Sequence, residues 1–192
     1  RRLRIAWCRR PDDRPVDPDL AAVLDRAVTR LSVLGHNIEE VDLPTSGWND
    51  VFGPLVLEEE GRLRGRLLES HLEDLTDYER ATLEAARSVQ PAAVEAARSK
   101  HKAFVSRMDD FFNVFDLIIT PSTATTAFPV GRRPEQIGGE RVGALWGAFP
   151  FTAAFNVAGT PGVSLPCGLS AGMPVGMQLI CRRGRDAQLL DI

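Results

Sequence analysis

Two short apolar segments late in the chain, residues 163–166 and 175–180, place the strongest constraint on the fold. Gly and Pro bound both segments, and this pattern predicts buried strands. They lie within residues 149–181, a stretch that also contains the small-residue loop 158–162. Because few of its side chains are polar, the stretch is typical either of a small-molecule pocket or of a tightly packed corner. We expect the rest of the chain to be organised around it.

The start of the chain predicts a helix between two strands. Residues 3–8 are apolar and predict the first strand. Asp17 and Pro18 then supply a helix N-cap and a proline for the first turn, and Gly35 ends the apolar stripe of this helix. A second strand is predicted over residues 36–43. This order predicts a parallel strand pair joined by a right-handed crossover.

The centre of the chain is predicted to be mainly helical. Residues 47–89 are rich in Glu, Arg and Leu, which indicates two or three helices with charged outer faces. A long helix is predicted from Pro91 to about residue 115, since apolar side chains recur there on one face. A buried strand should follow at residues 117–121. After it, residues 122–143 are rich in Gly, Pro and Thr and predict a long loop.

Composition excludes several classes of protein. The net charge of −3 is spread over 192 residues without a basic block, so nucleic-acid binding is not expected. No apolar run reaches the roughly 18 residues of a membrane span. The three cysteines lie far apart and have no histidine at ligand spacing, so neither a disulfide framework nor a metal site is indicated. We expect a soluble, cytoplasmic chain that does not bind membranes.

Candidates for catalytic residues are few, and we assign none. The carboxylates of residues 58–60 cannot converge, because consecutive helical residues point in different directions. The segment most like a nucleophile elbow, residues 162–166, has Pro166 where the second glycine belongs. The two lysines, Lys100 and Lys102, lie off the apolar stripe of their helix and are expected in solvent. No glycine-rich phosphate-binding motif occurs, so no cofactor is expected.

Several short motifs stand in an order that resembles the C-terminal part of the amidase signature family. They are DLIITPS at 116–122, FT at 151–152, Asn156, GTP at 159–161, SLPCG at 164–168 and PVGMQL at 174–179. The opening strand and helix are similar to the segment that comes after the core of that family. The resemblance spans essentially the whole chain. It is strong from about residue 114 to residue 181 and weak over residues 47–89.

The resemblance implies an α/β fold in which a mixed sheet is flanked by helices. Residues 1–192 would then be one C-terminal domain fragment, truncated at both ends. The family's amide hydrolases use a serine nucleophile, a bridging serine in a cis peptide and a lysine base, all in an upstream Gly/Ser-rich segment. This sequence has no such segment, so its expected partner is the missing N-terminal half of the same enzyme. Without that half an uncovered strand edge should drive self-association.

The resemblance also implies that this half of the enzyme contributes the wall of an acyl pocket for a small-molecule amide. The residues expected there are Thr120, Ser122, Trp146, Phe149, Phe151, Thr152 and Asn156. The aromatic side chains would supply apolar area, while Thr152 and Asn156 would orient the loop. For Asn156 the alternative stays open that its side chain only ties neighbouring backbone.

The leading hypothesis is the C-terminal half of an amidase that hydrolyses a carboxylic amide to an acid and ammonia or an amine through an acyl-enzyme. One alternative is a non-catalytic binding or interaction domain that keeps the fold. Another is the amidase subunit of a tRNA-dependent amidotransferase, although the absence of a basic patch favours a small-molecule amidase. The sequence does not name the amide, because the loop over residues 124–142 would decide it.

Overall fold

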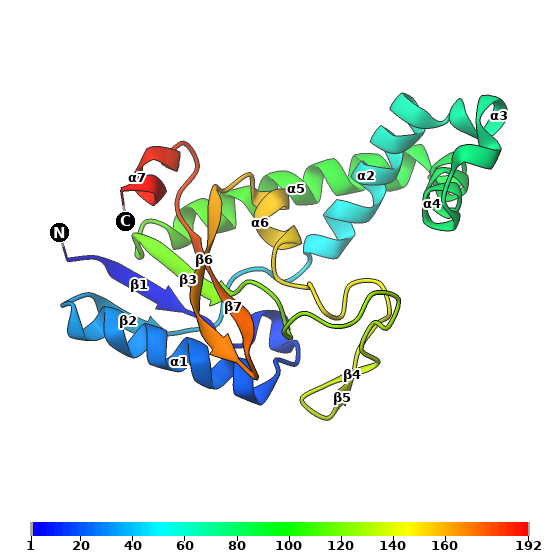
Figure 1. Ribbon diagram of the computed structural model, residues 1–192. Helices are drawn as coiled ribbons and strands as arrows, with labels where there is room; N and C mark the ends of the chain where they lie inside the picture. Colours follow the sequence, from blue (N-terminus) through cyan, green and yellow to red (C-terminus); the bar gives the residue numbers. More distant parts are fainter. Residues whose placement is uncertain (1, 192) are drawn as a thin grey trace. The chain divides into compact units, whose positions relative to one another are not determined.

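The computed structural model describes residues 2–191, which divide into two compact units (Figure 1). Unit 1 comprises the described residues up to Ser46 and those from Ser106 onward, and it contains the β-sheet. Unit 2 is Gly47–Val105 and is helical. The long helix α5 (Pro91–Phe111) contributes residues to both units.

A five-stranded mixed sheet forms the centre of unit 1, with the strand order β2-β1-β3-β7-β6. Its strands are β1 (Arg4–Trp7), β2 (Asn37–Glu40), β3 (Leu117–Pro121), β6 (Gly162–Ser170) and β7 (Met173–Ile180). Strand β1 pairs in parallel with β2 and β3, whereas β7 pairs antiparallel with β3 and β6. The predicted parallel pair and the predicted mixed sheet flanked by helices are both confirmed.

Helix α1 (Pro18–Val33) covers one face of this sheet (Figure 1). Its start follows the sequence prediction: the Asp17 carboxylate accepts the backbone N–H groups of Asp19 and Leu20 at 2.9 and 3.1 Å. The apolar stripe of α1 packs against side chains of β1, β3 and β7, and Leu24 in this stripe is fully buried. The burial of this face is what holds α1 on the sheet.

The alternation of side chains along β3 and β7 separates the two faces of the sheet. Ile119 pairs with Leu179, and both belong to the apolar cluster that packs on α1. The next pair along, Thr120 and Gln178, therefore points to the opposite face. Helix α6 (Ala153–Ala158) lies on the side of the sheet away from α1 (Figure 1). Strand periodicity thus places Thr120, one of the predicted site residues, on the face away from α1.

Strand β6 corrects one prediction. Residues 163–166 do form part of a strand, but Ser164, Leu165 and Pro166 are exposed rather than buried. The physical reason is that β6 is an edge strand, which pairs with β7 alone and which α1 covers only in part. A bulge between Pro166 and Gly168 brings Gly168 under α1, where a Cβ atom would lie 2.7 Å from Val23 Cγ1.

Three further features differ from the sequence prediction. The second strand ends at Glu40, because Glu40 pairs with Trp7, the last residue of β1. The predicted loop over residues 122–143 contains a hairpin of two short strands, β4 (Gln136–Ile137) and β5 (Glu140–Arg141). Helix α6 was not predicted. A short helix, α7 (Asp186–Leu190), follows β7.

Unit 2 bears out the prediction of charged helices. Its elements are α2 (Trp48–Arg64), α3 (Leu67–Ser70), α4 (Asp77–Ser88) and the first part of α5. The three carboxylates in succession on α2 point to different partners: Glu58 pairs with Arg98, Glu59 with Arg62, and Glu60 with Arg64. This is the solvated face that the sequence predicts. Within residues 2–191, none of the helices combines the length and the apolar character that a membrane span requires.

The exposed edge of β6 leads to a prediction about the isolated chain. Leu169 on this strand is 63% exposed and β6 carries no charged side chain, which is typical of an edge that pairs with another strand. We predict that the 192-residue chain self-associates at micromolar concentration and that Leu169→Lys shifts it toward monomer. Val33→Lys on α1, at a residue that is 83% exposed, is the matched control and should leave association unchanged. Light scattering measures all three, and a monodisperse parent chain would contradict the prediction.

Candidate functional site

A row of polar side chains crosses the sheet on the face away from α1. Thr120 is fully buried and Gln178 is 7% exposed. The Gln178 Nε2 group donates to Thr120 Oγ1 and to the backbone carbonyl of Phe151, both at 3.3 Å. The buried amide therefore has partners for its N–H groups, as a polar group in a core requires. Gln178 also joins strand β7 to the segment that precedes α6.

The row continues past the end of β3 as a pair of hydroxyl groups. The Oγ atoms of Ser122 and Ser164 are 2.6 Å apart, and the backbone N–H of Ser122 donates to the carbonyl of Gly176 at 3.0 Å. A Cβ atom on Gly176 would lie 2.8 Å from Ser164 Oγ and 2.9 Å from Ser122 Oγ. Gly176 lies on β7, between the strands that carry the two serines, and its missing side chain leaves room for the pair. We call Thr120, Gln178, Ser122 and Ser164 the polar row.

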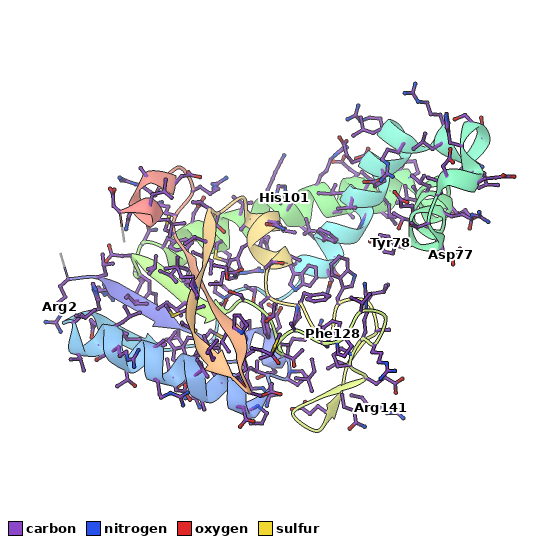
Figure 2. All side chains as sticks on the ribbon, viewed as in Figure 1. Arg2, Asp77, Tyr78, His101, Phe128 and Arg141 are labelled. Carbon is purple, nitrogen blue, oxygen red and sulfur yellow. The ribbon has the colours of Figure 1, made fainter. Side chains whose placement is uncertain are left out.

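An exposed aromatic surface precedes α6. Residues 144–149, which we call the aromatic turn, carry Trp146 at 51% exposure and Phe149 at 36% exposure. The Phe149 ring lies 6.0 Å from the ring of Phe128, measured between centroids. Phe128 itself belongs to the segment between β3 and β4 (Figure 2). Aromatic side chains left half in solvent offer apolar area to a ligand or a partner.

Backbone contacts join the aromatic turn to the end of β3. The N–H of Ala124 donates to the carbonyl of Ala148 at 3.0 Å, just beyond the hydroxyl of Ser122. At the end of the turn, Gln178 holds the carbonyl of Phe151. The polar row and the aromatic turn are therefore neighbours in unit 1.

The predicted pocket residues occupy three different environments. Thr120 and Ser122 belong to the polar row, and Trp146 and Phe149 belong to the aromatic turn. Phe151 is 2% exposed and packs in the cluster that contacts α1, so its ring lies in the core. Thr152 and Asn156 are exposed at the start and on the surface of α6. Whether a substrate touches these residues is not tested by their positions, and the set stays a prediction.

The structure also brings in residues that sequence reasoning did not select for the site. Gln178 is a polar residue inside an apolar strand, which is a signal for a buried hydrogen-bonding role. Ser164 and Gly176 could have been found from the register of β6 and β7, which the sequence does not give. Phe128 lies in a loop without periodicity, and nothing in the sequence marks its contact with Phe149.

The cysteine thiols, the Ser122 hydroxyl and the Lys100 amine lack the contacts that activate a nucleophile. Burial raises the pKa of the Cys8 thiol to about 11, and burial likewise raises the pKa of Cys167 and of Cys181. The hydroxyl of Ser122 has another hydroxyl as its partner instead of a base. Lys100 is exposed and pairs with Asp50 at 2.7 Å. Among the described residues, no cluster of His, Cys, Asp or Glu could hold a metal ion.

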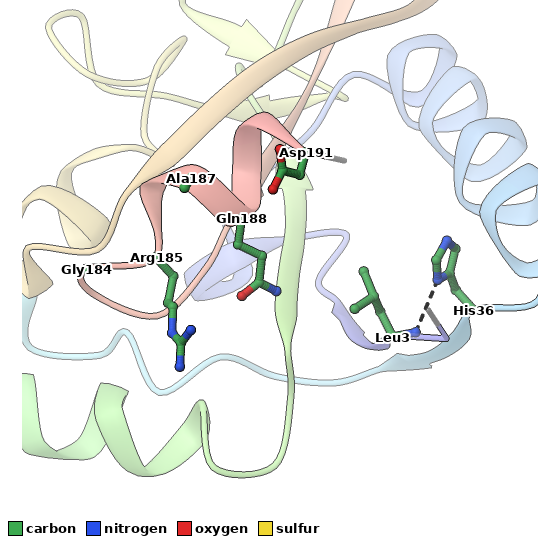
Figure 3. A pocket seen from close by; sticks show the side chains of 7 residues that line it. All are labelled: Leu3, His36, Gly184, Arg185, Ala187, Gln188 and Asp191. Carbon is green, nitrogen blue, oxygen red and sulfur yellow. Dashed lines mark hydrogen bonds between the residues drawn. The ribbon is translucent and has the colours of Figure 1, made fainter.

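A cavity of about 650 Å³ lies elsewhere in unit 1 and contains none of the predicted pocket residues (Figure 3). Its lining includes Leu3, Arg185 and Gln188, and also His36, whose Nδ1 atom accepts the backbone N–H of Leu3 at 3.2 Å. Leu3 precedes β1, whereas Ser122 follows β3, which is parallel to β1. The cavity is therefore at the opposite end of these strands from the polar row.

Comparison with known proteins defines the class. The family model described as Amidase matches residues 1–190. An indoleacetamide hydrolase from Bradyrhizobium diazoefficiens is 30% identical over 98% of this chain and 36% of its own length. The putative amidase AmiC from Mycobacterium leprae is 32% identical over 100% of this chain and 42% of its own length. A solved amidase structure, 23% identical, superposes with a TM-score of 0.88 over 99% of this chain and 44% of that one.

The chain belongs to the amidase signature family. The solved amidase supports the fold, with the same α/β arrangement over nearly all of this chain. The chain spans roughly two fifths of the length of the curated relatives it matches. The resemblance noted in the sequence is therefore confirmed at the level of family and fold.

The tight packing around Gly176 gives a prediction about stability. Gly176→Ala should lower the free energy of unfolding by about 1–3 kcal/mol, because the added Cβ crowds both serine hydroxyls. The matched control is Gly143→Ala, where nothing lies within 4 Å of the added atom, and its change should stay within about 0.5 kcal/mol.

The same substitution should cost less when both hydroxyl groups are removed by Ser122→Ala and Ser164→Ala. Urea unfolding followed by circular dichroism measures each variant and the triple variant. An equal cost of Gly176→Ala in both backgrounds would show that the hydroxyl pair is not what Gly176 accommodates.

Proposed function

We propose that this chain is the C-terminal part of an amidase that hydrolyses a small-molecule carboxylic amide with an apolar acyl group. The observation that carries the proposal is the half-exposed aromatic turn beside the polar row. Such a combination of apolar wall and few fixed polar groups is how small-molecule sites are lined. The names of the relatives agree with it, since one hydrolyses indoleacetamide and another neighbour is an aryl acylamidase.

In this proposal the nucleophile and the base of amide hydrolysis belong to a part of the enzyme other than these 192 residues. The family resemblance assigns a serine nucleophile, a bridging serine in a cis peptide and a lysine base to a segment upstream of this region. The nucleophile would attack the amide carbonyl, releasing ammonia or an amine and leaving an acyl-enzyme that water hydrolyses to the acid. Burial raises the pKa of the cysteine thiols of this chain, and the hydroxyl groups of Ser122 and Ser164 pair with each other. Both observations support a role of this chain as a pocket wall and not as the source of the nucleophile.

The partner in this proposal is the N-terminal half of the same enzyme, which would meet the uncovered edge of β6. An uncharged strand with exposed leucines is suited to pair with a further strand. The amidotransferase alternative has its own observation: a glutamyl-tRNA(Gln) amidotransferase chain from Syntrophomonas wolfei is 48% identical over 41% of this chain. That match covers less than half of the chain, and the net charge of −3 offers no basic patch for tRNA.

The proposal predicts that the 192-residue chain alone does not hydrolyse amides. A nucleophile, a base and oxyanion donors are all required together, and burial raises the pKa of each of its cysteine thiols, which disfavours the thiolate. Purified chain incubated with aryl and aliphatic amides should release no more amine than buffer alone, measured by chromatography. Turnover above the buffer blank that follows the concentration of the chain would contradict the assignment of catalysis to another segment.

In the complete enzyme, Trp146→Ala and Phe149→Ala should change the preference among acyl groups. Removal of an apolar contact with the substrate is worth about 1–3 kcal/mol, so the ratio of kcat/KM for long and short acyl amides should change about tenfold or more. Val130→Ala, at a fully exposed residue of the same long segment, is the matched control.

Phe151→Ala tests whether Phe151 is a residue of the core. Because Phe151 is 2% exposed, this substitution should lower the free energy of unfolding by about 3–5 kcal/mol, whatever its effect on the acyl preference. If Trp146→Ala and Phe149→Ala both keep the acyl preference of the parent, the aromatic turn is not part of the pocket.

A further inference from the structure

The entry to the aromatic turn is held by an arginine from the other side of the hairpin. The Arg133 Nη1 group donates to the backbone carbonyls of Ala144 and Leu145, both at 3.1 Å. These carbonyls immediately precede Trp146 and lie 11 and 12 residues along the chain from Arg133. A charged donor shared by two successive carbonyls restricts the backbone more than a neutral contact would.

Arg133 can act as an anchor because the hairpin that comes after it is fixed to unit 1. The side chain of Ile137 is 4% exposed and belongs to the cluster on α1. Glu140 pairs with Arg10 after β1 at 2.9 Å, between Oε1 and Nη2. Gly138 lies so close to the loop before α1 that an added Cβ would be 3.0 Å from the carbonyl oxygen of Val16. The hairpin therefore packs on the apolar cluster through Ile137 and contacts the segment between β1 and α1 through Gly138 and Glu140.

The exit of the aromatic turn is held independently. Ala148 accepts the N–H of Ala124 at 3.0 Å, and the N–H of Phe149 donates to the carbonyl of Trp146, also at 3.0 Å. Within the turn, the N–H of Gly147 donates to the carbonyl of Gly143 at 2.9 Å. Trp146 thus lies between an exit held by backbone contacts and an entry held by two features. Val142, just before the turn, packs on the apolar cluster, and the Arg133 side chain holds the next carbonyls, those of Ala144 and Leu145.

We propose that Arg133 is a positioning residue, which fixes the aromatic turn so that Trp146 is presented to the acyl group of the substrate. This inference rests on the proposed function, because it takes the aromatic turn as a wall of the acyl pocket. Arg133 acts through Trp146 and does not itself touch the substrate. Loss of its two hydrogen bonds loosens the turn at Ala144 and Leu145, while Val142, the hairpin and the core stay in place.

The experiment compares variants of the complete enzyme by hydrogen exchange and by kinetics. Arg133→Met keeps the length and the apolar stem of the side chain but removes both hydrogen bonds. It should raise the exchange rates of the Gly147 and Phe149 amides severalfold, measured by mass spectrometry on peptides that cover residues 143–150, and leave the melting temperature unchanged. It should also shift the ratio of kcat/KM for long and short acyl amides about threefold or more, in the same direction as Trp146→Ala.

Two further variants complete the set. Arg133→Lys keeps the charge and a terminal nitrogen with N–H donors but loses the planar guanidinium, so both quantities should lie between those of the parent and of Arg133→Met. Arg132→Met removes the same charge from the neighbouring exposed residue and should change neither quantity. Unchanged exchange over residues 143–150 in Arg133→Met overturns the inference.

The kinetic measurements distinguish a failure of this inference from a failure of the proposed function. If Trp146→Ala shifts the acyl preference and Arg133→Met does not, the positioning role is wrong and the pocket assignment stands. If neither Trp146→Ala nor Phe149→Ala shifts the preference, the pocket assignment fails, and with it the role of Arg133 in selecting the acyl group. If Phe149→Ala alone shifts the preference, the pocket assignment stands and the role of Arg133 through Trp146 is wrong. Faster exchange together with a parallel shift in preference supports both.

Discussion

The pairing of β3 on both of its edges is the interaction on which unit 1 depends. One edge of β3 is parallel to β1 and the other is antiparallel to β7, so this strand joins the opening strand–helix–strand unit to the closing hairpin. All five of its residues are buried. Its alternation also sends Ile119 toward α1 and Thr120 toward the candidate site. The core and the site are therefore two faces of the same short strand.

Much of the fold could be predicted because its signals are local. The N-cap at Asp17, the stripe of α1, the helix from Pro91 and the buried strand at residues 117–121 all follow from patterns within one element. The exposure of β6 could not be predicted, since it depends on which strands lie beside it in the sheet. An apolar segment has the same sequence pattern whether its position is central or at an edge, and only tertiary pairing distinguishes the two.

The candidate site shows the same division between local and long-range information. Motif resemblance located Thr120, Ser122 and the aromatic turn, but the contacts that organise them join residues far apart in the chain. Ser122 meets Ser164 only because β7 places Gly176 between them, and the turn is held by Arg133 from beyond a hairpin that has no clear sequence signal. The site is thus a product of strand register and loop anchoring, neither of which periodicity reveals.

In the function proposed above, the aromatic turn forms part of the acyl pocket of a complete amidase. The most direct measurement is a crystal structure of the complete enzyme, trapped with an aryl carbamate that acylates its nucleophile. We expect the bound acyl group to lie within about 4 Å of the side chain of Trp146 or Phe149. An acyl group that lies against other elements, with both aromatic side chains turned to solvent, would contradict it.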